Sequence, residues 1–337
     1  MSEPARRTLL LGAAAAGLGL VGCMGEGEGG GKEPAPTASS PRTSSSSTSP
    51  SSPPPEPLPS ASPWPLVRTE VEPQAKQAAV RLLEALGTWP RGQQGAAPAT
   101  ERAEVQDVAA GSVPDLVAQA QPLLDAGSEA TVRVIAAQYG GLLSARASVL
   151  VALRQWGRTA DGTVQDGGPT VDVRLTRTAA SGWQVSDLYP SRTAKPLARP
   201  GTLIEQVVAH ERIRLPPAAE ADVRAGQLRP KPLRALLTLA ETYEIDVSVV
   251  HTGHPRNVFG TDRLSDHTRM RAFDVWAVDG HTVIDPATSD ALIDGFMRAA
   301  AKAGAYNVGG PRQLGLPGFF SDRVHRDHLH IAFDSDG

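Results

Sequence analysis

The pattern of apolar and polar residues divides the chain into expected helices and strands. Apolar residues at helical spacing predict an amphipathic helix over residues 74–86, and a second short helix is expected over residues 114–124. The apolar face of the first helix consists of Ala78, Ala79, Leu82, Leu83 and Leu86. Runs rich in Val, Leu, Ile, Thr and Trp then predict strands at residues 130–139, 147–156, 170–178 and 182–188. Helices followed by a meander of long strands indicate an α+β fold.

A second set of elements begins near residue 200. Helical spacing predicts helices at residues 218–225, 232–243 and 286–303, while short apolar or alternating runs predict strands at residues 245–250 and 328–333. The roughly 270 residues in the two sets exceed the commonest size of a single domain, so we expect two. Their expected bounds are residues 64–195 and 196–337.

The first residues have the pattern of an export signal. Arg6 and Arg7 precede an apolar run over residues 9–21, which is too short to span a bilayer as a mature helix. The arginine pair resembles a twin-arginine signal, and the sequence LVGC at residues 20–23 matches the bacterial lipobox. Cys23 is the only cysteine, which excludes an intrachain disulfide and a cysteine-based metal site. We therefore expect a signal peptide over residues 1–22 and lipidation of Cys23.

Residues 23–63 are expected to form a disordered tether. They are rich in Gly, Ser, Thr and Pro, as in SSSSTSPSSPPPEP, and cannot bury enough apolar surface to offset the entropy of ordering. The formal net charge of the whole chain is −3 and there is no basic tract, so nucleic-acid binding has no electrostatic support. The pattern indicates an exported bacterial lipoprotein, anchored by lipid to the extracytoplasmic face of the cell membrane.

Candidate chemistry is concentrated in the last third of the chain. Seven of the eight histidines fall in residues 251–330, and the stretch HRDHLH at residues 325–330 holds three of them. His267 precedes Asp274 by seven residues. Histidine and carboxylate ligands suit zinc, and a hydrolytic zinc site needs about three protein ligands and an open position. Asp274 begins an apolar run, where an unpaired carboxylate would be costly to bury and a bound cation would remove that cost.

These spacings resemble the zinc D-alanyl-D-alanine carboxypeptidase family, which also includes vancomycin-resistance dipeptidases and phage endolysin peptidases. The family signature is Ser-x-His, an Asp seven residues after the His, and later His-x-Asp-x-x-His. This chain has SDH at residues 265–267, then Asp274, and HRDHLH at residues 325–330. The resemblance covers roughly residues 200–337 and implies a peptidase-like α+β domain there.

The resemblance also implies roles for individual residues. The zinc ion (Zn2+) would be held by His267, Asp274 and His330. Asp327 would be the general base that takes a proton from the attacking water, and His325 would orient the substrate or stabilise the developing oxyanion. His328 shares a strand face with His330, so it is an alternative ligand or a packing residue that orients a neighbour. His281, in the turn VDGHTV, is expected to face solvent.

The chain departs from the family pattern at two places. The family usually has glycine three residues after the first ligand histidine, and this chain has Met270 there. The family also has an upstream arginine that grips the substrate carboxylate, and in this chain the arginine of the corresponding stretch, HTGHPR, is displaced. The candidates for binding the substrate in its place are Arg256, Arg263 and His254.

The helices and strands of residues 64–195 resemble the NTF2-like (SnoaL-like) cone folds, which occur as accessory domains of exported actinobacterial proteins. The resemblance is one of architecture and rests on no specific motif. It implies either a spacer or partner-binding module, or a cone that holds a ligand. The stretch contains no histidine and no cluster of carboxylates in its strands.

The expected function is zinc-dependent hydrolysis of the peptide part of peptidoglycan, at a bond of the D-alanyl-D-alanine type. The expected partners are the peptidoglycan peptide and, through the lipid anchor, the membrane. The alternative is a non-catalytic cell-wall or ligand-binding lipoprotein whose metal site is structural or degenerate. A third possibility is that residues 64–195 bind a small molecule or a partner and carry the function.

Overall fold

The computed structural model describes residues 56–335. The expected signal peptide, the lipidation site Cys23 and residues 23–55 of the expected tether lie outside the described residues. Residues 56–63 have no regular secondary structure. Within residues 56–335, none of the helices combines the length and the apolar character needed to cross a bilayer.

Four helices open the part of the chain that we call the N-terminal half (residues 64–195). They are α1 (Pro73–Gly87), α2 (Ala96–Glu104), α3 (Val113–Gln119) and α4 (Gln121–Leu124). α1 confirms the predicted amphipathic helix; it starts at a proline, whose fixed φ suits a first helical position, and buries its Ala and Leu face. α3 and α4 together cover the range predicted for the second helix, residues 114–124. α2 was not predicted.

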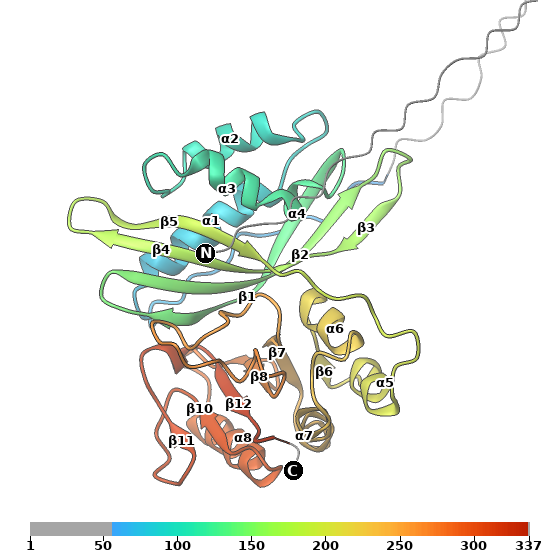
Figure 1. Cartoon of the computed structure of the whole chain (residues 1–337), viewed down its shortest axis with the longest axis vertical. Helices are drawn as coiled ribbons and strands as arrows, with labels where there is room; N and C mark the ends of the chain where they lie inside the picture. The colour runs from blue at the N-terminus through green and yellow to red at the C-terminus, as the bar shows by residue number, and fades with distance from the viewer. Residues whose placement is uncertain (1–55, 336–337) are drawn as a thin grey trace, which may run out of the picture. The chain divides into compact units, whose positions relative to one another are not determined.

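One antiparallel sheet forms the rest of the N-terminal half. Its strands are β1 (Glu129–Leu142), β2 (Arg146–Arg158), β3 (Val164–Gly167), β4 (Thr170–Thr178) and β5 (Gly182–Pro190). They run in the order β1-β2-β4-β5, with the short β3 added beside β2. Helices α1–α4 lie along this sheet (Figure 1). All four predicted strands are confirmed, each with slightly longer or equal bounds.

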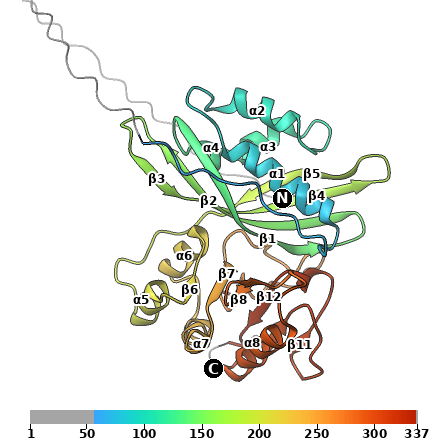
Figure 2. The ribbon, with the colours of Figure 1, turned by 180° about the vertical axis from the view of Figure 1, so that it is seen from behind.

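The C-terminal half (residues 196–335) contains helices and a mixed sheet. The helices are α5 (Thr202–Ala209), α6 (Pro217–Arg224), α7 (Pro230–Ala240), α8 (Asp290–Lys302) and the short 3₁₀ turn η1 (Val324–Arg326). The strands are β6 (Ile213–Arg214), β7 (Ile245–Val249), β8 (Ala272–Val278), β9 (His281–Thr282), β10 (Asn307–Gly309), β11 (Phe319–Phe320) and β12 (Leu329–Ala332). The sheet order is β11-β10-β12-β8-β7-β6, with β9 beside β8. Figure 2 shows β6, β7, β8 and β12 of this sheet from behind.

Two hydrophobic cores support this α+β architecture. The first joins α1, α3 and the inner face of the N-terminal sheet, and the second joins α7, α8 and the strands of the C-terminal sheet. Both cores nevertheless belong to one compact unit, which begins at Pro54. Trp64 and Trp276 pack across the junction with ring centroids 6.1 Å apart, and Thr69 donates a hydrogen bond to the carbonyl of Ile284.

The end of the C-terminal half reaches into the N-terminal half. Val324, in η1, packs against the first hydrophobic core. Asp327, just beyond η1, accepts hydrogen bonds from the Lys76 ammonium at 2.8 Å and from the Tyr139 backbone N–H at 3.1 Å. The histidine-rich stretch is therefore held from both halves of the unit.

Candidate metal centre

Two paired strands and one loop bring the predicted ligands together. β8 carries Asp274 and β12 carries His330, and these two residues lie directly opposite each other in the antiparallel register. His267 lies in the turn that leads into β8. Cross-strand partners lie within side-chain reach, so the pairing of β8 with β12 makes the site a consequence of sheet register.

The three predicted ligand atoms converge on one point. His267 Nε2 lies 3.1 Å from Asp274 Oδ1 and 3.2 Å from His330 Nδ1, and His330 Nδ1 lies 3.0 Å from Asp274 Oδ1. Ligand atoms about 2.0–2.1 Å from a tetrahedral zinc ion are separated from one another by roughly 3.3 Å. The residues present therefore fit a zinc ion.

Hydrogen bonds to the backbone fix which ring nitrogen faces the centre. His267 Nδ1 lies 2.7 Å from the carbonyl oxygen of Val250, and His254 Nδ1 lies 2.8 Å from that of Pro255. A carbonyl accepts, so each Nδ1 carries the proton, and in the neutral form of each ring the lone pair lies on Nε2. Such a tautomer is the form in which imidazole binds a metal ion.

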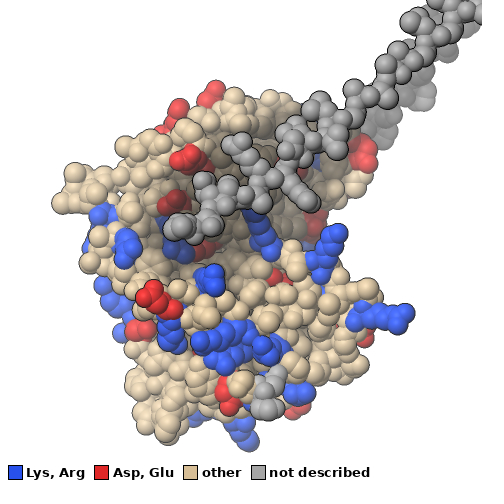
Figure 3. Space-filling view, in the orientation of Figure 1, with Lys and Arg blue, Asp and Glu red and all other residues tan. Residues whose placement is uncertain are grey.

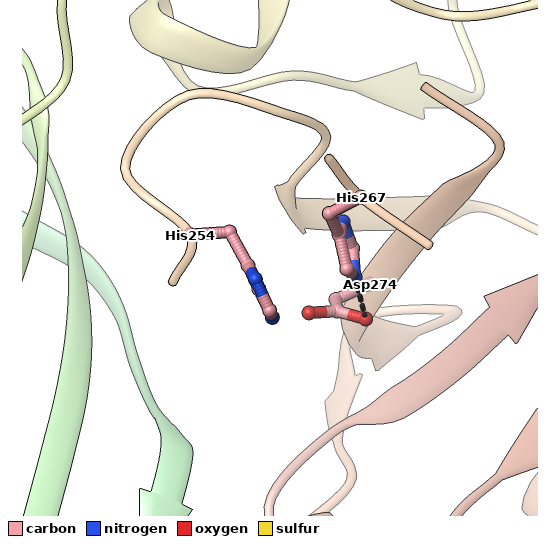
Figure 4. A group of neighbouring side chains, drawn as sticks. All are labelled: His254, His267 and Asp274. Atoms are coloured by element: carbon pink, nitrogen blue, oxygen red, sulfur yellow. Dashed lines mark hydrogen bonds and ion pairs between the residues drawn. The ribbon is translucent and has the colours of Figure 1, made fainter. Parts of the chain in front are cut away.

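His254 joins the cluster, although the sequence suggested it as a substrate contact. Its ring stacks on that of His267 at 4.1 Å between centroids and 18° between planes. Potential ligand atoms of His254, His267 and Asp274 all lie within 4.8 Å of one another. Figure 4 shows the three side chains turned toward one another, with His254 on a loop.

The centre is buried, and its carboxylate would be stabilised by a bound cation. The His267 and Asp274 side chains are 0% and 1% exposed. Burial alone would raise the pKa of Asp274, but the neighbouring His267 and His328 hold it well below its ordinary value. Burial lowers the pKa of His330 to about 4, so this ring is neutral. In the described part of the chain, the ion-pair partners of Asp274 are histidines, not lysine or arginine.

Asp327 lies beside the centre, and its carboxylate is already engaged. Oδ2 accepts hydrogen bonds from Lys76 and from the Tyr139 N–H, and Oδ1 accepts one from His328 Nδ1 at 2.6 Å. His328 then presents Nε2 toward the centre, 4.0 Å from Asp274 Oδ2. Burial would lower the pKa of His328, but Asp274 and Asp327 raise it, which makes its ring a stronger base.

His325 lies against the other two histidines of its stretch. Its ring centroid is 5.0 Å from that of His328 and 5.9 Å from that of His330. Its Nδ1 lies 2.8 Å from Asp322 Oδ1, which fixes the ring orientation. His281, expected in solvent, is exposed.

The substrate-binding candidates separate into two groups. Arg256 and His254 line a cavity of about 310 Å³ next to the centre, together with Arg192 and Tyr189 from the N-terminal half. Arg263 is exposed and does not line this cavity. The structure therefore brings Arg256 and His254 to one cavity and leaves Arg263 outside it.

Met270 stands where the family has glycine, and its backbone adopts a conformation that is typical of glycine. Its φ is +59°, in the left-handed region that a side chain disfavours by about 1–2 kcal/mol. Its N–H donates to the carbonyl of His267 at 2.8 Å, so the turn that holds His267 closes as a glycine would allow. The substitution thus costs some stability without displacing the ligand.

Two residues of the N-terminal half complete the surroundings of the centre and were not predicted. Gln138, on β1, donates to Asp274 Oδ2 at 2.6 Å. Lys76, on α1, bridges Glu70 and Asp327 with its side chain fully buried. A lysine among the alanines and leucines of an amphipathic helix is the one signal in the sequence that pointed to such a partner.

Comparisons with known proteins identify no family for the chain. No protein-family model matches it, and no curated protein matches its sequence. Among solved structures, an NTF2-like superfamily protein from Salmonella enterica serovar Typhimurium is 12% identical, covers 39% of this chain and 96% of its own, and has a TM-score of 0.26. A protein assigned as an aromatic ring hydroxylase from Novosphingobium aromaticivorans is 12% identical, covers 35% and 87%, and has a TM-score of 0.25.

Proposed function

We propose that the chain is a zinc metallopeptidase that hydrolyses peptide bonds of peptidoglycan, of the D-alanyl-D-alanine type. The observation that carries the proposal is the convergence of His267 Nε2, Asp274 Oδ1 and His330 Nδ1 within 3.0–3.2 Å of one another. Their spacing in the sequence is that of the zinc carboxypeptidases. Zinc-dependent release of D-alanine from a defined muropeptide is the test.

The mechanism assigns the remaining side chains to proton transfer and substrate binding. When bound, a zinc ion would lower the pKa of a water molecule and polarise the scissile carbonyl. His328 Nε2 accepts the proton of the attacking water, and Asp327, on Nδ1 of the same ring, stabilises the imidazolium that forms. His325 lies beside them, held by its hydrogen bond to Asp322, and would orient the substrate. We therefore assign the general base to His328, although the sequence predicted Asp327. Both carboxylate oxygens of Asp327 already accept hydrogen bonds, from Lys76 and from His328.

A double-mutant cycle separates these roles. His328→Gln is expected to keep zinc and to lose about 10²–10⁴-fold in turnover, the usual contribution of a general base. If Asp327 acts through His328, Asp327→Asn added to His328→Gln slows turnover no further, because the two residues work as one unit. Multiplication of the two single losses would instead make Asp327 an independent base.

The cavity beside His254 supports a substrate with a free carboxylate. Arg256 and Arg192 are exposed and line it from the two halves of the unit. On the face shown in Figure 3, Lys and Arg side chains also gather over the C-terminal half. A larger cavity, of about 760 Å³, is lined by none of the residues of the metal centre. The stem peptide of peptidoglycan ends in a carboxylate that paired arginines bind well.

A second candidate function is a non-catalytic lipoprotein with a closed, structural zinc site. The position of His254 favours it, because a fourth protein ligand would occupy the place that water needs. In the proposed peptidase, His254 is a substrate contact and not a ligand. His254→Ala is therefore expected to leave zinc affinity within about threefold of wild type while KM rises, since the three ligands remain. A fall in zinc affinity as large as that of a ligand mutant would establish the closed site.

The location that suits this substrate is the outer face of the membrane. The lipobox at residues 20–23 supports lipidation of Cys23, and a Gly- and Pro-rich tether would let the enzyme reach the wall. Cys23→Ser should leave the chain in the soluble or the unprocessed fraction. If this variant fractionates with the membrane as wild type does, the anchor is elsewhere.

A further inference from the structure

Strand β1 of the N-terminal half places a side chain on the metal centre of the C-terminal half. Gln138 is 1% exposed and its amide N–H donates to Asp274 Oδ2 at 2.6 Å. The hydroxyl of Ser248, on β7, donates to the other end of the same amide, Gln138 Oε1. The amide is thus held at both ends, and its donor side can only face Asp274.

The hydrogen bond from Gln138 gives the two carboxylate oxygens of Asp274 different partners. Oδ1 of Asp274 faces the two ligand histidines, His267 Nε2 at 3.1 Å and His330 Nδ1 at 3.0 Å. Oδ2 is turned away and is occupied by Gln138. A carboxylate tied in this way binds with one oxygen in a fixed direction, and residues that so orient a ligand typically contribute 10–100-fold to metal affinity.

We propose that Gln138 is a positioning residue of the metal centre, and that the N-terminal half is therefore part of the site and not a spacer. The inference rests on the zinc binding proposed above. No other side chain of the described residues donates a hydrogen bond of ordinary length to Asp274 Oδ2. Without Gln138, that oxygen would be buried with its strongest partner missing, and the carboxylate would be free to rotate.

The chain offers a matched control for a purely structural role. Gln155, on the neighbouring strand β2, is also buried and donates its amide to the backbone carbonyls of Gly87 and Leu123. All of its partners lie within the N-terminal half. Gln155→Leu should therefore reduce stability much as Gln138→Leu does, while leaving the metal centre unchanged.

The experiment measures zinc affinity by chelator competition on the chain from residue 56 onward, in wild type, Gln138→Leu, Ser248→Ala and Gln155→Leu. Gln138→Leu is expected to bind zinc about 10–100-fold more weakly. Ser248→Ala should show a smaller loss in the same direction, because the amide remains but is no longer oriented. Gln155→Leu should match wild type. With cobalt in place of zinc, Gln138→Leu should also change the visible absorption, since a freed carboxylate can bind with both oxygens.

The outcomes separate this inference from the proposed function. If wild type binds no zinc, the metal centre itself is wrong. If wild type binds zinc and Gln138→Leu binds it equally tightly with an unchanged cobalt spectrum, only the role of Gln138 is overturned. Equal loss of affinity in Gln138→Leu and Gln155→Leu would also overturn it, because general loosening of the N-terminal half would then be the cause.

Discussion

His267→Ala is expected to weaken zinc binding by about 10²–10³-fold and to reduce peptide hydrolysis to background. Zinc held by four protein ligands is bound with about 10–16 kcal/mol, so each ligand contributes about 3–4 kcal/mol, or two to three powers of ten. His267 is fully buried and its Nε2 lies within 3.2 Å of both other ligand atoms. Removal of this side chain therefore leaves a buried gap among the ligands and takes one ligand atom away from the zinc ion. Zinc per chain after dialysis against a weak chelator is the measurement.

His281→Ala is the matched control for this prediction. His281 is exposed on β9 and lies outside the cluster, so its removal should leave the zinc content unchanged. Equal zinc in wild type and His267→Ala would remove the proposed centre altogether. Loss of zinc in both variants would indicate that surface histidines bind the metal, and the centre would lose its support.

Lys76→Met is expected to lower the free energy of unfolding by about 3–5 kcal/mol, the usual cost of removing one partner from a buried ion pair. Lys76 is fully buried and pairs with Glu70 and with Asp327 at 2.8 Å. Methionine keeps the length of the side chain but leaves two carboxylates buried side by side. Urea unfolding of the chain from residue 56 onward measures the loss.

The deficit of Lys76→Met should shrink as the pH falls. Burial raises the pKa of Glu70 above its ordinary value, so the folded state takes up a proton there at a higher pH than the unfolded chain does. The Lys76 ammonium lowers this pKa in wild type, so its removal raises the pKa further, and the folded variant gains more stability on acidification than wild type does. Lys231→Met is the control, because its pair with Asp334 is 35% and 66% exposed and such pairs contribute about 1 kcal/mol or less. If Lys76→Met also lowered the free energy of unfolding by only about 1 kcal/mol or less, the buried Lys76–Asp327 pair would not hold the N-terminal and C-terminal halves together.

Local pattern was enough to predict most of the longer elements and to single out His267, Asp274 and His330, which the fold brings together. The strongly periodic helix α1 and the long strands β1, β2, β4 and β5 were expected close to their observed bounds. The short elements were not; they are α2, α5, β3, β6, β9, β10 and β11. α2 buries only Ala99 and Ala103, and β3 is largely exposed, so neither has an apolar period to detect. α5 contains Ile and two Val, which favour strands as readily as a short helix.

The partners from the N-terminal half could not be predicted, because they are set by tertiary packing. Gln138 meets Asp274 across 136 positions of sequence, and Lys76 meets Asp327 across 251. No spacing rule connects residues so far apart. The seven-residue spacing of His267 and Asp274 and the His-x-His stretch were visible because a turn and a strand carry them. The sequence likewise did not reveal that the Lys76 ammonium donates a hydrogen bond to Asp327, the residue expected to be the general base.

The most direct measurement is the release of D-alanine from a pentapeptide muropeptide by the chain from residue 56 onward, with one equivalent of zinc and after its removal by a chelator. We expect release by the zinc-loaded protein, loss of release on chelation, and recovery when zinc is restored. A protein that binds one zinc through His267, Asp274 and His330 and releases no D-alanine would contradict the peptidase and leave the non-catalytic lipoprotein in its place.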